Sequence, residues 1–172
     1  MKQLRSLFAS LFLIITMFFS TSTAQAAEII IPTYGTFGGG TIAGDIFEWS
    51  STSGEYQSWG GFAATNEGGG EAYLPFIFSV DGQLTVNAAV PGGGNATLRF
   101  VFENAPHPNN IPNIEVSIPI SGSTITPYSV ALPAQGDQTF SNFVFYITTA
   151  DTPVQIQDIQ VAYDDPVVDP DA

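Results

Sequence analysis

Apolar side chains recur at every second position along much of this sequence, and this alternation restricts the folds open to the chain. In the run from residue 95 to residue 103, one phase is entirely apolar: Ala96, Leu98, Phe100 and Phe102. The runs 83–90 and 113–120 repeat the pattern, with polar residues concentrated in the second phase. Period-two alternation is typical of a β-strand that buries one face. Because helical spacing is nearly absent, we predict an all-β protein.

Glycine and proline separate these runs from one another. The sequence holds 17 Gly and 12 Pro, and they punctuate it at the spacing of an all-β sandwich or barrel. We predict about nine strands in two stacked antiparallel sheets, which form a jelly-roll-like sandwich. The predicted strands are 28–31, 46–50, 72–79, 83–90, 95–103, 113–120, 127–132, 139–148 and 153–163.

The last predicted strand changes phase partway along its length. Its apolar residues before position 157 lie in one phase, and those after Asp158 lie in the other. A slip of one residue around Gln157-Asp158 is what a β-bulge produces, and such a bulge would redirect the Asp158 side chain. A strand buried on both faces explains the same pattern, so both interpretations stay open here.

The first 26 residues have the pattern of a secretory signal peptide. Lys2 and Arg5 precede an apolar run at 7–19, and Ala24-Gln25-Ala26 supplies small residues for cleavage after Ala26. This run is shorter than the roughly 20 residues that span a bilayer, and a retained anchor is the alternative. We predict a signal peptide at 1–26, a β-sandwich domain at 27–163, an acidic tail with prolines at 164–172, and export of the mature protein.

Charge limits the partners of the mature chain. Cleavage would leave Arg99 as the one basic residue against all 16 Asp and Glu residues. Nucleic acid is excluded, and anionic lipid surfaces are disfavoured, because both require clustered Lys and Arg. Anionic polysaccharides would be repelled unless a divalent cation bridged them, whereas neutral polysaccharides would not. We expect Arg99 to face outward and to pair with an acid such as Glu115 on the next strand, and contact of Arg99 with a sugar is the alternative.

The sequence lacks the residues that most kinds of catalytic site require. The single histidine, His107, lies between two prolines and has no second histidine as a metal-binding partner, so we interpret it as a solvated loop residue. With no cysteine, the fold must depend on its core. A glycosidase needs two carboxylates, and enough are present to leave a small glycosidase as an alternative. We predict a protein that is not an enzyme and that is a monomer.

The stretch from Phe47 to Phe76 concentrates large aromatic residues in glycine-rich sequence. Both tryptophans, Trp49 and Trp59, lie here, together with Tyr56 and Asn66. Sugar rings present flat C–H faces that stack on aromatic rings, while amides and carboxylates hydrogen-bond to their hydroxyls. We therefore select Trp59, Trp49, Tyr56 and Asn66 as candidate carbohydrate-binding residues. Burial of both tryptophans in the core is the alternative, because large aromatic residues usually pack inside.

Three segments resemble a known family. They are 59–66 (WGGFAATN) with 73–76 (YLPF), 98–103 (LRFVFE), and the closing segment 128–161. Together they are similar to galactose-binding-like β-sandwich carbohydrate-binding modules, as attached to secreted bacterial β-glucanases and agarases. The resemblance implies a non-catalytic carbohydrate-binding module for a neutral polysaccharide of β-glucan or galactan type. The alternative is an extracellular structural or adhesive domain without a glycan site, and exposure of the tryptophans separates the two.

The resemblance also implies a structural calcium site. In that family an acid on the last strand binds calcium together with residues near the N-terminus, which suggests Asp158 and, more weakly, Glu28. Asp158 lies one residue later than the family pattern places its acid. The large negative charge favours bound calcium, because a hard dication with oxygen ligands offsets local repulsion. The alternative is that Asp158 is a solvated strand residue.

Overall fold

The computed structural model describes residues 26–30, 34–54, 57–64, 76–105 and 107–164. These residues form β-strands and loops. No helix that could cross a membrane is present among them.

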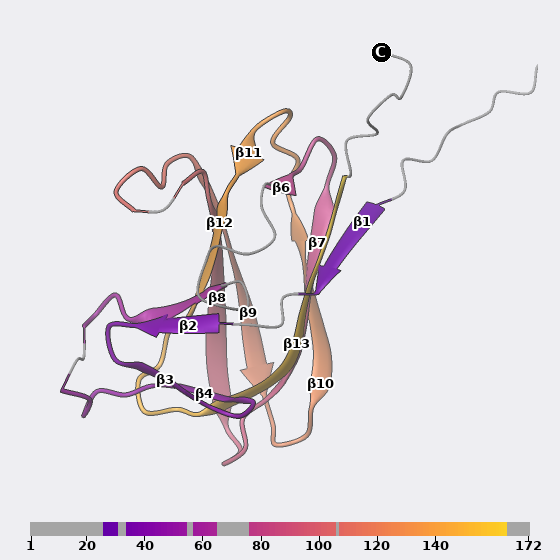
Figure 1. The fold of residues 1–172 in the computed structure, drawn as a ribbon. Coiled ribbons are helices and arrows are strands. Elements are labelled where there is room, and N and C mark those ends of the chain that lie inside the picture. Colours follow the sequence, from indigo (N-terminus) through magenta and orange to yellow (C-terminus); the bar gives the residue numbers. More distant parts are fainter. Residues whose placement is uncertain (1–25, 31–33, 55–56, 65–75, 106, 165–172) are drawn as a thin grey trace, which may run out of the picture.

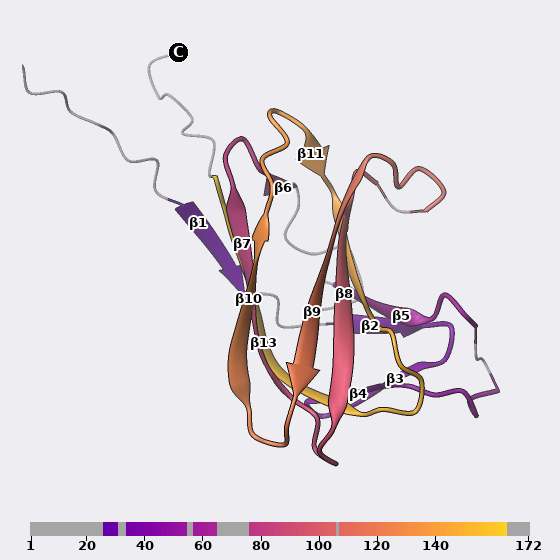
Figure 2. The same ribbon diagram turned by 180° about the vertical axis from the view of Figure 1, so that it is seen from behind.

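Two antiparallel sheets are stacked face to face (Figures 1 and 2). The larger sheet contains β1 (Ala26–Ile30), β3 (Gly40–Ala43), β4 (Ile46–Trp49), β7 (Gly82–Ala89), β10 (Thr126–Leu132) and β13 (Val154–Asp164). Its order is β10-β7-β13-β4-β3, with β1 also paired to β13. The second sheet contains β2 (Tyr34–Phe37), β5 (Gly61–Ala64), β8 (Asn95–Glu103), β9 (Asn113–Ser121) and β12 (Asn142–Ile147). Its order is β2-β5-β12-β8-β9, and a small third sheet pairs β6 (Phe76–Ile77) with β11 (Thr139–Phe140).

The all-β sandwich of two antiparallel sheets is therefore confirmed, with more strands than the alternation indicates. The described residues form thirteen strands. Three of the additional strands, β2, β3 and β5, have only four residues each. The predicted strand 139–148 is divided into β11 and β12. Strands of only four residues that include glycine are too short to show the period-two alternation of apolar side chains.

Phenylalanine rings fill the space between the sheets. Eight of them are fully buried: Phe62, Phe76, Phe78, Phe100, Phe102, Phe140, Phe143 and Phe145. Phe62 and Phe145 stack with ring centroids 4.9 Å apart, and both contact Phe47 of the opposite sheet, at 5.3 and 5.6 Å. Such pairs contribute about 0.5–1.5 kcal/mol beyond the burial of their area. The sequence has no cysteine, so these contacts hold the two sheets together without a disulfide.

A β-bulge interrupts β13, which is one of the two interpretations that the phase change left open. Its register against β7 shifts between Ile156, opposite Ala88, and Asp158, opposite Asn87. Gln157 is the extra residue. The shift keeps both Ile156 and Ile159 in the core, although three positions separate them. A regular strand would turn one of the two isoleucines outward.

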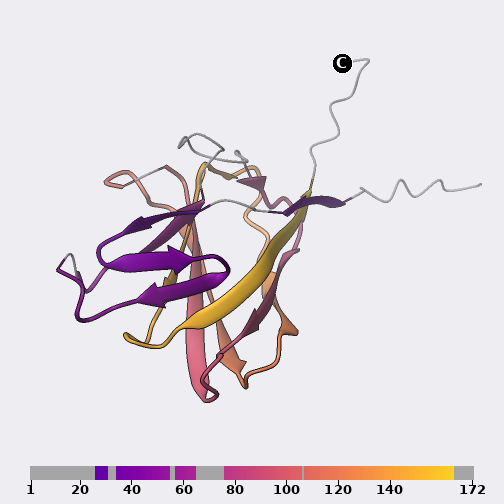
Figure 3. The ribbon, with the colours of Figure 1, turned by 60° about the horizontal axis from the view of Figure 1, so that its bottom comes forward.

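Two connections cross between the sheets at one end of the sandwich. The turn Gly38-Gly39 joins β2 of one sheet to β3 of the other, and both glycines have positive φ, 57° and 93°. The segment from 50 to 60 returns from β4 of the larger sheet to β5 of the five-stranded sheet. Figure 3 brings these indigo and purple strands forward. These crossings position the loop that carries Trp59.

Replacement of Phe62 by alanine tests the dependence of the fold on its aromatic core. Phe62→Ala should lower the free energy of unfolding by about 3–5 kcal/mol, because it leaves a cavity where three rings meet. Urea denaturation measures the change. Val80→Ala, at a side chain that is 54% exposed, is the control and should change stability by about 0.5 kcal/mol or less. Equal effects of the two substitutions would contradict this account of the core.

Candidate binding groove

A groove of about 610 Å³ lies on the outer face of the five-stranded sheet. Strand alternation creates it: β12 turns Phe143, Phe145 and Ile147 toward the core and Asn142, Val144 and Tyr146 outward. Val144 pairs with Ala63 of β5 on one side and with Val101 of β8 on the other. Val101 and Val144 are buried, and Ala63 is half-buried, even though they face away from the core. These small apolar side chains form the centre of the outer face of the sheet.

Aromatic rings line one end of the groove. Trp59 and Phe37 are stacked, with ring centroids 6.2 Å apart and planes 20° from parallel. Phe37 in turn meets Tyr146 edge to face at 5.9 Å. Trp59 is 59% exposed, which is unusual for the largest apolar side chain in a small domain. This end therefore presents ring surface to solvent beside the sheet.

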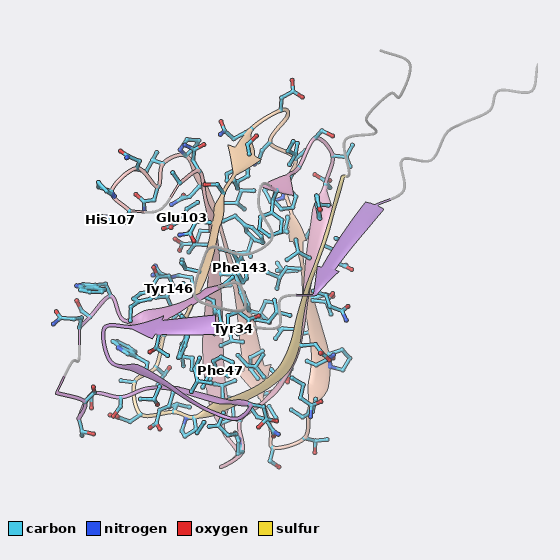
Figure 4. The ribbon with its side chains drawn as sticks, viewed as in Figure 1. Tyr34, Phe47, Glu103, His107, Phe143 and Tyr146 are labelled. Atoms are coloured by element: carbon cyan, nitrogen blue, oxygen red, sulfur yellow. The ribbon has the colours of Figure 1, made fainter. Side chains whose placement is uncertain are left out.

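Carboxylate and amide groups line the other end. Glu103 is only 6% exposed, and its Oε2 accepts a hydrogen bond of 2.6 Å from Nδ2 of Asn142. Its Oε1 accepts one of 3.2 Å from Nδ2 of Asn110, which belongs to the β8–β9 loop. His107 of the same loop is exposed and completes this wall. In Figure 4, Glu103, Tyr146 and His107 lie on the outer side of the sheet, whereas Phe143 lies between the sheets.

The Trp59 loop is placed by close backbone contacts. The carbonyls of Gly38 and Gly39 accept hydrogen bonds from the backbone N–H groups of Gln57, at 3.0 Å, and Ser50, at 3.2 Å. A Cβ atom on Gly60 would lie 2.0 Å from the Gly38 carbonyl oxygen. One on Gly61 would lie 2.7 Å from both the Phe145 carbonyl oxygen and the Tyr146 ring. The two glycines after Trp59 therefore let the loop approach the β2–β3 turn and β12.

Asp151 fixes the start of the same loop. Its carboxylate accepts hydrogen bonds from the backbone N–H of Ser51, at 2.8 Å, and from the hydroxyls of Ser51 and Ser50. Its own N–H donates to the carbonyl of Trp49 at 2.9 Å. The Ser51 hydroxyl and backbone N–H lower the pKa of Asp151, because they favour the ionised form. The β12–β13 turn thus holds the Trp59 loop through one carboxylate.

The structure separates the candidate sugar-binding residues. Trp59 lines the groove. Trp49 is half-buried, donates its indole N–H to the carbonyl of Gln57 at 3.2 Å, and lines a second, smaller hollow instead. Tyr56 and Asn66 lie outside the described residues. The two tryptophans are therefore not both buried. Burial of both would have argued against a binding surface.

Several groove residues were not selected from the sequence. They are Phe37, Glu103, His107, Asn110, Asn142 and Tyr146. The outward phase of β12 was a usable signal, because Asn142 and Tyr146 alternate with buried phenylalanines. Glu103 and Asn142 are distant in sequence and meet through the pairing of β8 with β12. His107 is an exposed loop residue, as interpreted, and it borders the groove as well.

Arg99 pairs with Glu115, as predicted. Its Nη1 lies 3.6 Å from Oε1 of Glu115. The guanidinium also stacks on Tyr146, with Cζ 4.3 Å from the ring centroid. Burial, and then the negative charge of Glu103, raise the pKa of Tyr146. Tyr146 is therefore a neutral phenol at physiological pH, with one ring that contacts both Phe37 and Arg99.

Asp158 hydrogen-bonds within the sheet. Its Oδ2 accepts a bond of 3.2 Å from Nδ2 of Asn87, the residue opposite it at the bulge. Within the described part of the chain, no group of three or more Asp, Glu or His side chains is arranged to hold a metal ion. The side chain of Glu28 is not among those described. The calcium site at Asp158 and Glu28 therefore stays a prediction.

Comparison with solved structures identifies the fold. The chain is similar to the apo structure of CBM1 of BiXyn10A, with a TM-score of 0.51 and 12% identity over 80% of this chain and 97% of that one. It is also similar to the N-terminal CBM22-1-CBM22-2 tandem domain of Paenibacillus barcinonensis Xyn10C, with a TM-score of 0.50 and 10% identity over 88% of this chain and 50% of that one. No protein-family model and no curated protein matches the sequence. The resemblance to β-sandwich carbohydrate-binding modules is thus confirmed at the level of the fold.

The lowered pKa of Asp151 predicts an acid-sensitive contribution to stability. Asp151→Ala should destabilise the protein near neutral pH, because the ionised carboxylate holds Ser50 and Ser51. A lowered folded-state pKa gives stability that is present above the unfolded value of about 3.9 and is lost as the pH falls through the folded value. The difference in unfolding free energy between wild type and variant should decrease as the pH falls from about 3.9 through the folded-state pKa of Asp151. Urea denaturation at a series of pH values measures it.

Ser51→Ala is the matched partner for this experiment. It removes one hydroxyl donor and should reduce the same pH dependence, and the double variant should show coupling between the two positions. A difference between wild type and Asp151→Ala that does not change with pH would contradict a role for the ionised carboxylate.

The predicted calcium site has a thermal signature. Saturating calcium should raise the melting temperature by several degrees, because a ligand that binds the folded state alone stabilises it. Asp158→Ala should remove this increase. Melting curves that coincide in calcium and in chelator, at matched ionic strength, would rule out the site.

Proposed function

We propose that this protein is a secreted, non-catalytic carbohydrate-binding module whose groove holds a neutral polysaccharide of β-glucan or galactan type. The observation that carries the proposal is the groove itself. It combines exposed ring surface at Trp59, an apolar sheet face at Val144, and a fixed carboxylate at Glu103. A mostly apolar hollow with a few oriented polar groups is the usual form of a site for a small ligand.

The two ends of the groove suit the two kinds of surface on a sugar. The C–H face of a pyranose ring would stack on Trp59 or Tyr146. Hydroxyl groups would donate to Glu103, whose oxygens keep lone pairs beyond those used by Asn110 and Asn142. Because those two amides already hold the carboxylate, it would need little ordering when the ligand binds. The fold shared with carbohydrate-binding modules supports the same assignment by analogy.

Charge supports a neutral ligand. Beyond residue 26 the chain carries one arginine against 16 acids, and Glu103 lies in the groove itself. A polymer with a carboxylate or sulfate on every unit would be repelled along its whole length. A neutral polymer offers many hydroxyl donors to this acceptor and meets no such repulsion.

The surroundings of Glu103 favour binding of a polysaccharide without its cleavage. Glycoside hydrolysis uses two carboxyl groups on either side of the scissile bond. Among the described residues that line the groove, Glu103 is the one carboxylate, and each of its oxygens accepts from an asparagine. We therefore expect no release of reducing ends from any polysaccharide that the protein retains.

Trp59 provides the direct test of the groove. Trp59→Ala should weaken binding about thirtyfold, or about 2 kcal/mol, as expected for loss of an aromatic ring that stacks on the ligand. Trp59→Phe, which keeps a ring, should retain part of the affinity. Affinity electrophoresis against mixed-linkage β-glucan, linear galactan, agarose and alginate measures retention, and circular dichroism checks the fold. Val80→Ala, at an exposed position outside the groove lining, should bind like the wild type.

Two results would overturn the proposal. Equal retention of Trp59→Ala and wild type would place the ligand elsewhere on the protein. Failure of the wild type to bind any neutral polymer in the panel would favour the alternative, an extracellular structural or adhesive domain. If Trp59→Ala loses the native circular dichroism spectrum, the comparison of Trp59→Phe with wild type takes its place in both tests.

A further inference from the structure

We infer that the hollow beside the groove is a subsite for a single acidic sugar unit, a uronate carried by an otherwise neutral polysaccharide. This inference rests on the proposed function, because it extends the same binding surface. The hollow has a volume of about 240 Å³, and its lining includes Trp49, Ser58, Arg99, Tyr146 and Thr148. It therefore combines ring surface, two hydroxyls and a guanidinium.

Tyr146 connects the two hollows. Its side chain lines both the groove and the smaller hollow. One partner of its ring, Phe37, lines the groove, and the other, the guanidinium of Arg99, lines the smaller hollow. A glycan that contacts Tyr146 from the groove would thus place its next unit or its branch beside Arg99. The two hollows form adjoining parts of one surface.

Arg99 has the charge and the free donors that a carboxylate requires. A guanidinium carries five N–H donors, and this one is held by ring stacking and by a single carboxylate at 3.6 Å, beyond ordinary hydrogen-bond length. Its buried Nε has no hydrogen-bond partner among the described residues. Its side chain is 38% exposed, so the outer nitrogens are open to a ligand. A uronate would form charge-assisted hydrogen bonds there, which are stronger than those to a neutral hydroxyl.

The surrounding acids limit this subsite to isolated carboxylates. Glu115, 49% exposed, already faces the guanidinium, and Glu103 lies at the far end of the groove. One carboxylate beside Arg99 therefore meets a local cation, whereas a polyuronate would also place carboxylates against Glu103. The structure thus favours a sparsely substituted polymer over a fully anionic one.

A matched pair of polymers tests the subsite. Mixed-linkage β-glucan and linear galactan would each be compared with the same preparation sparsely oxidised at C6, so that isolated units become uronates. The oxidised form should bind wild type about two- to fivefold more tightly at low salt, the range expected for an exposed charge pair. This gain should disappear in ~0.5 M sodium chloride, where exposed charges are screened. Alginate, with a carboxylate on every unit, should not bind.

Two variants assign the gain to Arg99. Arg99→Gln should reduce the ratio of the two affinities to one, because the amide cannot pair with a carboxylate as an ion. Glu115→Gln should raise the ratio above that of wild type, because it removes the carboxylate that competes for the guanidinium. The measured quantity is the ratio for each variant, so a general effect on folding or on binding of the neutral chain cancels.

The possible results separate this inference from the proposed function. Binding of the unmodified polymer with no gain on oxidation would overturn the subsite alone. A gain that persists in Arg99→Gln would also overturn it, because another group would then hold the uronate. Absence of binding by both forms would overturn the proposed function and this inference together.

Discussion

Packing of aromatic rings between the two sheets positions the strands that contribute to the groove. Phe143 and Phe145 face the core, so period-two alternation turns Asn142, Val144 and Tyr146 to the outer face. A slip of one residue in β12 would exchange these two sets. The contacts of Phe145 with rings from both sheets oppose such a slip. The groove is therefore a product of the same register that builds the core.

A second level of order comes from short backbone contacts. The Trp59 loop is fixed at its beginning by Asp151 and at its end by the glycines that follow Trp59. Gly60 lies against Gly38, and no side chain would fit between them. These contacts involve small residues and one carboxylate, and they allow an exposed tryptophan to be held without burial. Binding surfaces gain affinity when their side chains are ordered before the ligand arrives.

Sequence predicted what depends on periodicity and on neighbouring strands. The long strands and the pairing of Arg99 with Glu115 follow from alternation along a chain. Alternation alone did not separate the bulge at Gln157 from a strand buried on both faces. The four-residue strands around Gly35 and Gly61 carry too little pattern to be recognised. The polar end of the groove was missed because Glu103 and Asn142 meet only when β8 pairs with β12. Sequence also could not distinguish Trp59 from Trp49, since both lie in similar glycine-rich surroundings and only the loop contacts separate them.

The loop that carries Trp59 begins on a strand of one sheet and ends on a strand of the other, whereas Tyr146 belongs to the five-stranded sheet alone. Sliding of one sheet past the other would change the span that this loop must bridge. Its end is nevertheless held by the contact of Gly61 with β12, and Trp59 stacks on Phe37 of the same sheet as Tyr146. The spacing of the two rings is therefore set within one sheet, so a polymer that contacts both rings would meet the same surface when the sandwich is sheared.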